Sequence, residues 1–294
     1  MRAVVVHNES AGSGNIEPDE VRQALIRRGC MVSYRAIDDE RWVDEARDAD
    51  VVVAAGGDGT VASVFIALAG ATVPILVLPI GTANNIARTI GASTDDPLSE
   101  LELRASGAPA RFSVPLLTID GVTSRFVESV GGGVFADLLD DETERDTDGE
   151  GTDGGSRRLH RIIDRARSIG WNIEVDGQDA SGDYVAVEAM NIKETGPNVA
   201  LAPDADPADS AIDLVLVTAD DVARLHELIH DHGSEAVETA PRFRTIRGRT
   251  IRLRANTYAH LRVDDELRQP TGDGLRCVTI EVDDVGVNVL RGLP

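Results

Sequence analysis

Two glycine-rich segments carry the residues best suited to bind a phosphate group. Each follows a short apolar run, residues 51–55 and 75–79, and each could begin a helix. Glycine has no Cβ, so the backbone can turn sharply and approach a ligand. The free N–H groups and the positive dipole end of a helix would face that ligand. A phosphate site is therefore predicted at Gly56, Gly57, Asp58, Gly59 and Thr60, together with Gly81, Thr82, Ala83, Asn84 and Asn85.

The polar side chains of these turns have more than one interpretation. Asp58 is expected either to hold Mg²⁺ through water or to fix the loop, and Thr82 and Asn84 are expected to donate hydrogen bonds to the ligand. The alternatives are a purely structural turn with an Asx-type hydrogen bond at Asp58 and ordinary helix capping by Asn84. The ligand-binding interpretation is favoured because the two turns share one pattern.

An α/β domain over residues 1–110 is predicted to position both turns. Strand patterns at residues 2–6, 31–36, 51–55 and 75–79 alternate with helical patterns, which is typical of a mostly parallel sheet. From residue 111 to 283 the chain consists of short β-rich runs separated by turns, the first at 113–119. This pattern predicts a second domain built as an antiparallel β sandwich.

Two segments of the second domain differ from the strands around them. Residues 137–156 are rich in Asp, Glu, Gly and Thr, which predicts a solvated acidic loop. Residues 157–170 have apolar residues at helical spacing and several arginines, so they predict a helix. A basic amphipathic helix can lie on a membrane surface. The favoured interpretation is a surface helix docked on the sandwich, because every such helix needs one apolar stripe.

The overall charge narrows the possible partners. The chain has 51 acidic and 29 basic residues, a net charge of −22, and Lys193 as its one lysine. Binding to nucleic acid and to anionic membranes depends on cationic patches, so neither is favoured and no nucleic-acid partner is expected. The sequence has no pattern of a signal peptide or of a transmembrane helix, which predicts a cytoplasmic protein that could associate peripherally with a membrane. The oligomeric state stays open, a homodimer included.

Motifs along most of the chain resemble the diacylglycerol kinase catalytic-domain family, which includes bacterial lipid kinases and the sphingosine and ceramide kinases. Besides the two glycine turns, four segments carry this resemblance in the expected order. They are the first loop with Asn8, Ser10 and Gly12, the stretch at residues 131–136, the segment from Ala202 to Asp213, and residues 263–266.

The resemblance implies an ATP-dependent lipid kinase that phosphorylates the hydroxyl of diacylglycerol or a related lipid alcohol, as in phospholipid biosynthesis. It implies ATP contacts from Asn8, Ser10, Gly12, the Gly56–Thr60 turn and Thr82. It implies that Glu266, with Asp264 beside it, removes the proton of the acceptor hydroxyl, which is a role suited to a carboxylate. It also implies a bound Mg²⁺ at Asp206, Asp209 and the carbonyl of Ala211, and a last strand, about residues 284–294, that returns to the first domain.

Departures from the family pattern keep alternatives open. Ala62 and Ser63 stand where the family carries Asn and Glu, which suggests a non-catalytic nucleotide sensor as an alternative. An NAD kinase, which shares the Gly-Gly-Asp-Gly turn, is the nearest enzyme alternative. Ser210 and Asp265 stand where glycine is usual, so both turns are expected to be strained or differently shaped.

One motif points to different chemistry. His226, Glu227 and His230 form a His-Glu-x-x-His pattern, in which two histidines bind zinc and the glutamate acts as general base of a protease. The position of the third ligand in the extended pattern is Ala236. Leu225, Leu228 and Ile229 give the segment the apolar face of an ordinary helix, so the zinc hypothesis is not favoured.

Overall fold

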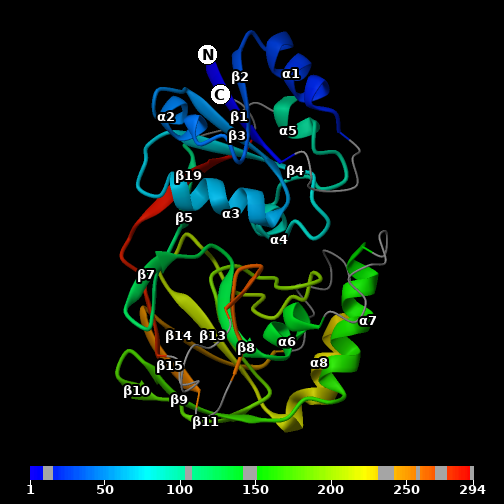
Figure 1. The fold of residues 1–294 in the computed structure, drawn as a ribbon, viewed down its shortest axis with the longest axis vertical. Helices are drawn as coiled ribbons and strands as arrows, with labels where there is room; N and C mark the ends of the chain where they lie inside the picture. Colours follow the sequence, from blue (N-terminus) through cyan, green and yellow to red (C-terminus); the bar gives the residue numbers. More distant parts are fainter. Residues whose placement is uncertain are drawn as a thin grey trace. The chain divides into compact units, whose positions relative to one another are not determined.

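The computed structural model divides the chain into two compact units. It describes residues 1–8, 16–102, 108–141, 151–230, 242–255, 259–268 and 277–291. Unit 1 consists of Met1–Val114 and Val285–Pro294, and unit 2 consists of Pro115–Asp284 (Figure 1). Among the described residues, no helix combines the length and the apolar character needed to cross a bilayer.

Unit 1 contains a six-stranded sheet in the order β2-β1-β3-β4-β19-β5. The first five of these strands are parallel to one another, and β5 is antiparallel to β19. The predicted α/β domain with a mostly parallel sheet is confirmed. The strands are β1 (Arg2–His7), β2 (Met31–Ala36), β3 (Val51–Gly56), β4 (Pro74–Pro79), β5 (Ala110–Ser113) and β19 (Gly286–Leu290).

Helices follow the strands of unit 1, and the central strands are apolar on both faces. Every residue of β3 is buried, which explains its unbroken apolar sequence. The helix that follows β3, α3, buries Val61, Val64 and Phe65. The helices are α1 (Pro18–Arg27), α2 (Arg41–Arg47), α3 (Asp58–Ala67), α4 (Asn85–Thr89) and α5 (Ser99–Glu102).

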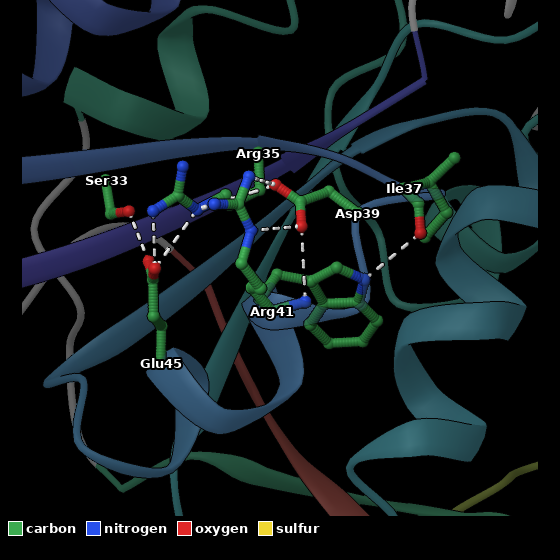
Figure 2. Close-up of polar contacts among 7 residues, drawn as sticks. Ser33, Arg35, Ile37, Asp39, Arg41 and Glu45 are labelled. Atoms are coloured by element: carbon green, nitrogen blue, oxygen red, sulfur yellow. Dashed lines mark hydrogen bonds and ion pairs between the residues drawn. The ribbon is translucent and has the colours of Figure 1, made fainter.

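Edge strand β2 is tied to helix α2 by polar contacts (Figure 2). Arg35 of β2 approaches Glu45 of α2 to 2.5 Å between Nη2 and Oε1. Ser33 donates to the same carboxylate, and the two hydrogen bonds lower the pKa of Glu45. The indole Nε1 of Trp42 donates to the carbonyl of Ile37 at 3.1 Å. These contacts fix the outer edge of the sheet.

Unit 2 is an antiparallel sandwich of two sheets, as predicted. Phe126, Trp171 and Leu214 belong to the apolar core that joins them. One sheet has the order β10-β9-β15-β18-β6-β7, with β11 paired to β9, and the other has the order β14-β13-β12-β8-β16-β17. The first contains β6 (Leu116–Ile119), β7 (Val122–Arg125), β9 (Ile169–Val175), β10 (Gln178–Asp179), β11 (Gly182–Tyr184), β15 (Thr250–Ala255) and β18 (Cys277–Glu281). The second contains β8 (Ser129–Gly133), β12 (Ala186–Met190), β13 (Ile212–Val217), β14 (Arg244–Gly248), β16 (Leu261–Val263) and β17 (Glu266–Arg268).

A second apolar core of unit 2 includes side chains from helices α6 (Val134–Asp140), α7 (Gly151–Ile163) and α8 (Val222–His230). The prediction of a continuous loop over residues 137–156 is wrong in part, because α6 extends to Asp140 and α7 begins at Gly151. The helix predicted from residue 157 also ends earlier than expected, at Ile163. The amino-acid composition gave a wrong prediction for α6 because Leu138, near the end of this helix, is buried in the core despite its acidic neighbours. Residues 142–150 lie outside the described residues.

Candidate functional site

The two glycine turns of unit 1 touch each other at the carboxyl ends of β3 and β4. The two strands are parallel neighbours, with Gly56 opposite Pro79, and the N–H of Ile80 donates to the carbonyl of Gly56 at 3.1 Å. A Cβ added to Gly81 would lie 2.3 Å from the Cα of Gly57. The turns therefore contact each other through their backbones at one edge of the sheet.

Two of the side chains predicted at the site hold the turns together. Oδ1 of Asp58 accepts the N–H of Ile86 in the first turn of α4 at 2.9 Å. Asn84 is in the left-handed conformation (φ 55°), and its amide binds both the N–H and the carbonyl of Gly81, at 3.0 and 2.8 Å. Of the two roles expected for Asp58, fixing the loop is the one the geometry shows. Asn84 likewise shapes the turn around Gly81.

The start of α3 supplies the hydrogen-bond donors of the first turn. This ten-residue helix begins at Asp58, directly after Gly57. The N–H groups of its first turn have no acceptor within the helix, and the helix dipole is positive at this end. A Cβ at Gly56 would lie 2.4 Å from the side chain of Thr60, which is buried, so glycine is needed where Thr60 packs. Thr82, in the second turn, is exposed.

A cavity of about 300 Å³ borders the second turn. Its walls come from Ile16, Pro79, Ile80, Gly81, Asn84 and residues 94–98. Pro97 and Leu98 add apolar surface, and Asp95 and Asp96 add carboxylates that can accept hydrogen bonds. The cavity thus combines apolar surface with a larger share of polar surface.

The predicted contacts of the first loop are described only in part. Asn8 follows β1, and its N–H donates to the carbonyl of Ala55 at 3.3 Å, so it lies beside the end of β3. Ser10 and Gly12 lie outside the described residues.

In unit 2, the two carboxylates predicted to act in proton removal, Asp264 and Glu266, lie on the hairpin of β16 and β17. Val263 pairs with Glu266, and Asp264 and Asp265 form the turn. The positive φ of this turn, 53°, falls on Asp264 and not on Asp265, the position where glycine is usual. Glu266 is the accessible member, with a side chain 63% exposed and an ion pair to Arg268 at 2.5 Å.

Asp264 is buried, and its carboxylate binds the backbone of a neighbouring segment. It accepts the N–H groups of Val127, Glu128 and Ser129, with shortest distances of 3.1, 2.7 and 3.2 Å. Burial raises the pKa of Asp264 to about 6, although the three N–H groups and the nearby Arg262 lower it. The carboxylate is thus enclosed by the fold, and Glu266 is the group that a ligand can reach.

The residues predicted to hold Mg²⁺ form two local turns. Asp206 and Asp209 each accept the N–H of the residue two positions on, at 2.9 and 3.0 Å. Ser210 has a φ of 60°, as expected where glycine is usual. Asp209 also pairs with Arg247 through Oδ2, so a cation bound at this carboxylate would compete with that arginine. The oxygen donors suit Mg²⁺, and the assignment stays a prediction.

The zinc motif is helical, and one of its histidines contacts another helix. Nδ1 of His226 on α8 lies 2.6 Å from Nδ1 of His160 on α7, and its Nε2 lies 3.2 Å from Asp164. Glu227 is exposed, and the side chain of His230 is not described. Within the described ranges, no three His, Cys, Asp or Glu residues are arranged to hold a metal ion.

Sequence reasoning missed a buried ion pair beside Asp264. Glu188 of β12 and Arg262 of β16 approach to 3.1 Å, and both are almost fully buried. The available signal was a charged residue at the centre of an apolar strand, as in Ala186–Met190. Charged residues at such positions are almost never buried unless they are paired.

Comparisons with known proteins agree for both units. Residues 2–115 match the diacylglycerol kinase catalytic domain, and residues 159–282 match the YegS C-terminal NAD kinase beta sandwich-like domain. A probable lipid kinase YegS-like from Xanthomonas oryzae pv. oryzae is 32% identical over 224 residues, which is 70% of this chain and 70% of that protein. A diacylglycerol kinase from Mycobacterium tuberculosis is 23% identical over 218 residues, 73% of this chain and 71% of that protein.

A solved structure shows the same fold. A putative diacylglycerol kinase from Bacillus anthracis str. Sterne superposes with a TM-score of 0.69 at 16% identity, over 95% of this chain and 91% of that one.

Proposed function

The chain belongs to the diacylglycerol kinase catalytic-domain family and is a lipid kinase, and we propose that it transfers the γ-phosphoryl group of ATP to the hydroxyl of diacylglycerol or a related lipid alcohol. The observation that carries the proposal is the contact between the two glycine turns, Gly57 against Gly81, at the carboxyl edge of the unit 1 sheet. Ligands of open α/β sheets bind at this edge.

The nucleotide part of the proposal uses the backbone of unit 1. The N–H groups at the start of α3 suit the phosphates, since an anion there meets free donors and a positive dipole end. The cavity beside Gly81 has apolar walls for a purine ring and carboxylates that can accept ribose hydroxyl groups. Bound with ATP, Mg²⁺ would neutralise charge on the phosphate oxygens.

The acceptor part uses the β16–β17 hairpin of unit 2. Glu266 would take the proton of the lipid hydroxyl as the hydroxyl oxygen bonds to the γ-phosphorus. The bond from that phosphorus to the bridging oxygen breaks, and ADP leaves with the electron pair. Glu266 suits the role because it is exposed, whereas Asp264 is occupied by three backbone N–H groups. Asp264 is then a support of the turn.

A lipid substrate requires contact with a membrane surface. The region from α7 to β9 is one of the basic segments of this acidic chain, with Arg157, Arg158, Arg161, Arg165 and Arg167 within eleven positions. We propose that the exposed residues among them, such as Arg165 and Arg167, contribute to transient peripheral binding.

A screen of ATP consumption tests the proposal. Wild-type protein with Mg-ATP is expected to phosphorylate at least one of diacylglycerol, phosphatidylglycerol and a long-chain base. Glu266→Gln should lower the rate about 10²- to 10⁴-fold, as loss of a general base does. Asp58→Ala should also abolish most of the activity, because α4 loses the contact that joins it to the first turn.

The control is Glu227→Gln on the exposed face of α8, which should keep full activity. Phosphorylation of NAD with no lipid product would establish the NAD kinase alternative. ATP binding without transfer to any acceptor would establish the sensor alternative, and unchanged activity in Glu266→Gln would refute the assignment of the base.

A further inference from the structure

Three residues lie in one row across the second sheet of unit 2. Gly131 of β8 is the register partner of Glu188 on one side and of Arg262 on the other. A Cβ at Gly131 would lie 2.4 Å from the carboxylate of Glu188. The missing side chain leaves room for two residues on strands either side of β8 to meet, with 3.1 Å between Nη2 of Arg262 and Oε2 of Glu188.

The guanidinium of Arg262 joins four separate parts of unit 2. Besides Glu188 it donates to the hydroxyls of Ser129 and Thr195. Its Nη1 donates to the carbonyl of Asp264 at 3.0 Å. The Arg262 side chain is 5% exposed and that of Glu188 is 0% exposed, so neither charge can be removed alone without leaving the other unpaired in the interior.

The polar groups of Asp264 are therefore bound on every side. Its N–H donates to the carbonyl of Ser129 at 2.9 Å, its carboxylate accepts three backbone N–H groups, and its carbonyl accepts from Arg262. The left-handed conformation is less favourable for a residue with a side chain than for glycine, although Asp tolerates it better than most, and these contacts stabilise it at Asp264. Glu266 follows two residues later, so the direction of its backbone depends on this turn.

We propose that Arg262, held by Glu188, is a positioning residue for phosphoryl transfer: it fixes the left-handed turn at Asp264 and so places Glu266 for proton removal. The inference rests on the proposed function, since it gives Arg262 a part in that reaction. The role needs both the donor geometry and the positive charge of the guanidinium.

The positive charge of Arg262 also affects the pKa of Asp264, so the titration of this carboxyl gives a second readout that is independent of activity. Arg262 lowers the pKa of Asp264, against the larger effect of burial that raises it. Among the described residues, the other ionisable groups near this turn include Glu188 on β12, Glu128 and Glu194 beside the contacted residues Ser129 and Thr195, and Asp265, Glu266 and Arg268 in the hairpin itself. Loss of the Arg262 charge should raise the pKa of Asp264 further, so its carboxylate would protonate at higher pH and bind the three N–H groups less strongly.

The test compares three variants of the full chain. Glu188→Gln/Arg262→Met removes both charges and keeps similar volumes, so it avoids an unpaired buried carboxylate. Arg262→Lys keeps the charge and loses the planar fork of donors. Arg252→Met is the control, since Arg252 pairs with Glu174 on exposed surface of the other sheet.

The double variant is expected to lower kcat about 10- to 100-fold with the KM for ATP unchanged, because small displacements of a catalytic group cost this much. The acid limb of its pH–kcat profile and the NMR titration of the Asp264 carboxyl should both move to higher pH. Arg262→Lys should lower kcat while the titration of Asp264 stays near that of the wild type, and Arg252→Met should change neither.

A folded double variant with unchanged kcat, or with an unchanged Asp264 titration, would overturn the inference. If wild-type protein phosphorylates no lipid, the proposed function fails, and the NMR titration still decides whether Arg262 controls Asp264. The two failures are therefore distinguishable.

Discussion

Replacing each of the two touching glycines by alanine should have very different consequences. Carbon atoms in contact normally lie about 3.5–4.0 Å apart. The new methyl group of Gly81→Ala would lie 2.3 Å from the Cα of Gly57 and 2.9 Å from Oδ1 of Asn84. One neighbour is backbone and the other belongs to a side chain that already holds the turn, so the turn itself must move by more than 1 Å.

The matched change, Gly57→Ala, makes a much milder contact. Its methyl group would lie 3.2 Å from the Cα of Gly81, so a shift of a few tenths of an ångström relieves it. Overpacking costs about 1–3 kcal/mol, and we expect Gly81→Ala near 3 kcal/mol. For Gly57→Ala we expect less than about 1 kcal/mol, since the reduced entropy of the unfolded chain offsets part of the cost. A loss of 3 kcal/mol should lower Tm by about 6–12 °C.

Tryptophan fluorescence can measure the free energy of unfolding of unit 1 alone. The chain has two tryptophans, of which Trp42 lies in unit 1 and Trp171 in unit 2. In a Trp171→Phe background, urea unfolding followed by Trp42 reports the free energy of unfolding of unit 1. Both glycine variants should be compared with that background. Equal midpoints for the two variants would refute the claim that the backbones of the turns are in contact.

Two further predictions concern unit 2. Because burial raises the folded pKa of Asp264 to about 6, above its unfolded value near 4, the folded state holds this proton more tightly. The free energy of unfolding of the wild type, relative to that of Asp264→Asn, should therefore fall by about 3 kcal/mol in total as pH rises from about 4 to 6. Urea unfolding of both proteins at pH 4, 5, 6 and 7 measures this difference. An advantage of the wild type that grows with pH would contradict the assignment. Arg165→Glu/Arg167→Glu should weaken the free energy of binding to phosphatidylglycerol vesicles, measured by co-sedimentation, by about 2 kcal/mol or more, since each arginine lost costs near 1 kcal/mol. The control Arg27→Glu/Arg28→Glu on unit 1 should bind as the wild type does, and equal binding by both double variants would remove this surface from the proposal.

The sequence predicted the features that depend on neighbouring residues. The apolar run that forms β3 and the glycines after it specify a buried strand followed by a turn, so their positions could be predicted. The prediction of a loop over residues 137–156 was wrong in part because it rested on the polar composition of the segment, whereas Leu138 packs in a core formed with residues far away in the chain. The run at residues 113–119 likewise looked like one strand. It is divided at Val114 and Pro115, and β5 joins the sheet of unit 1 whereas β6 joins unit 2.

The roles of individual polar residues could not be predicted, because their partners are far away in the chain. Asp58 binds the N–H of Ile86, 28 residues later, and Arg262 meets Glu188, 74 residues earlier. Both contacts depend on which strands are neighbours and on their register. A family motif identifies Asp58 as important, and the structure adds that its carboxylate joins two turns.

The same geometry bears on the departures at Ala62 and Ser63. The side chains of Asp58 and Asn84 form hydrogen bonds to the backbone of the turns. In the proposed site, phosphate would therefore be bound mainly by the N–H groups at the start of α3. Ala62 is buried within α3, and the hydroxyl of Ser63 donates to the carbonyl of Gly59 at 2.8 Å. Neither residue removes an N–H group from that first turn. The loss of two polar side chains at these positions is therefore compatible with phosphate binding through the backbone, so Ala62 and Ser63 are no argument against nucleotide binding.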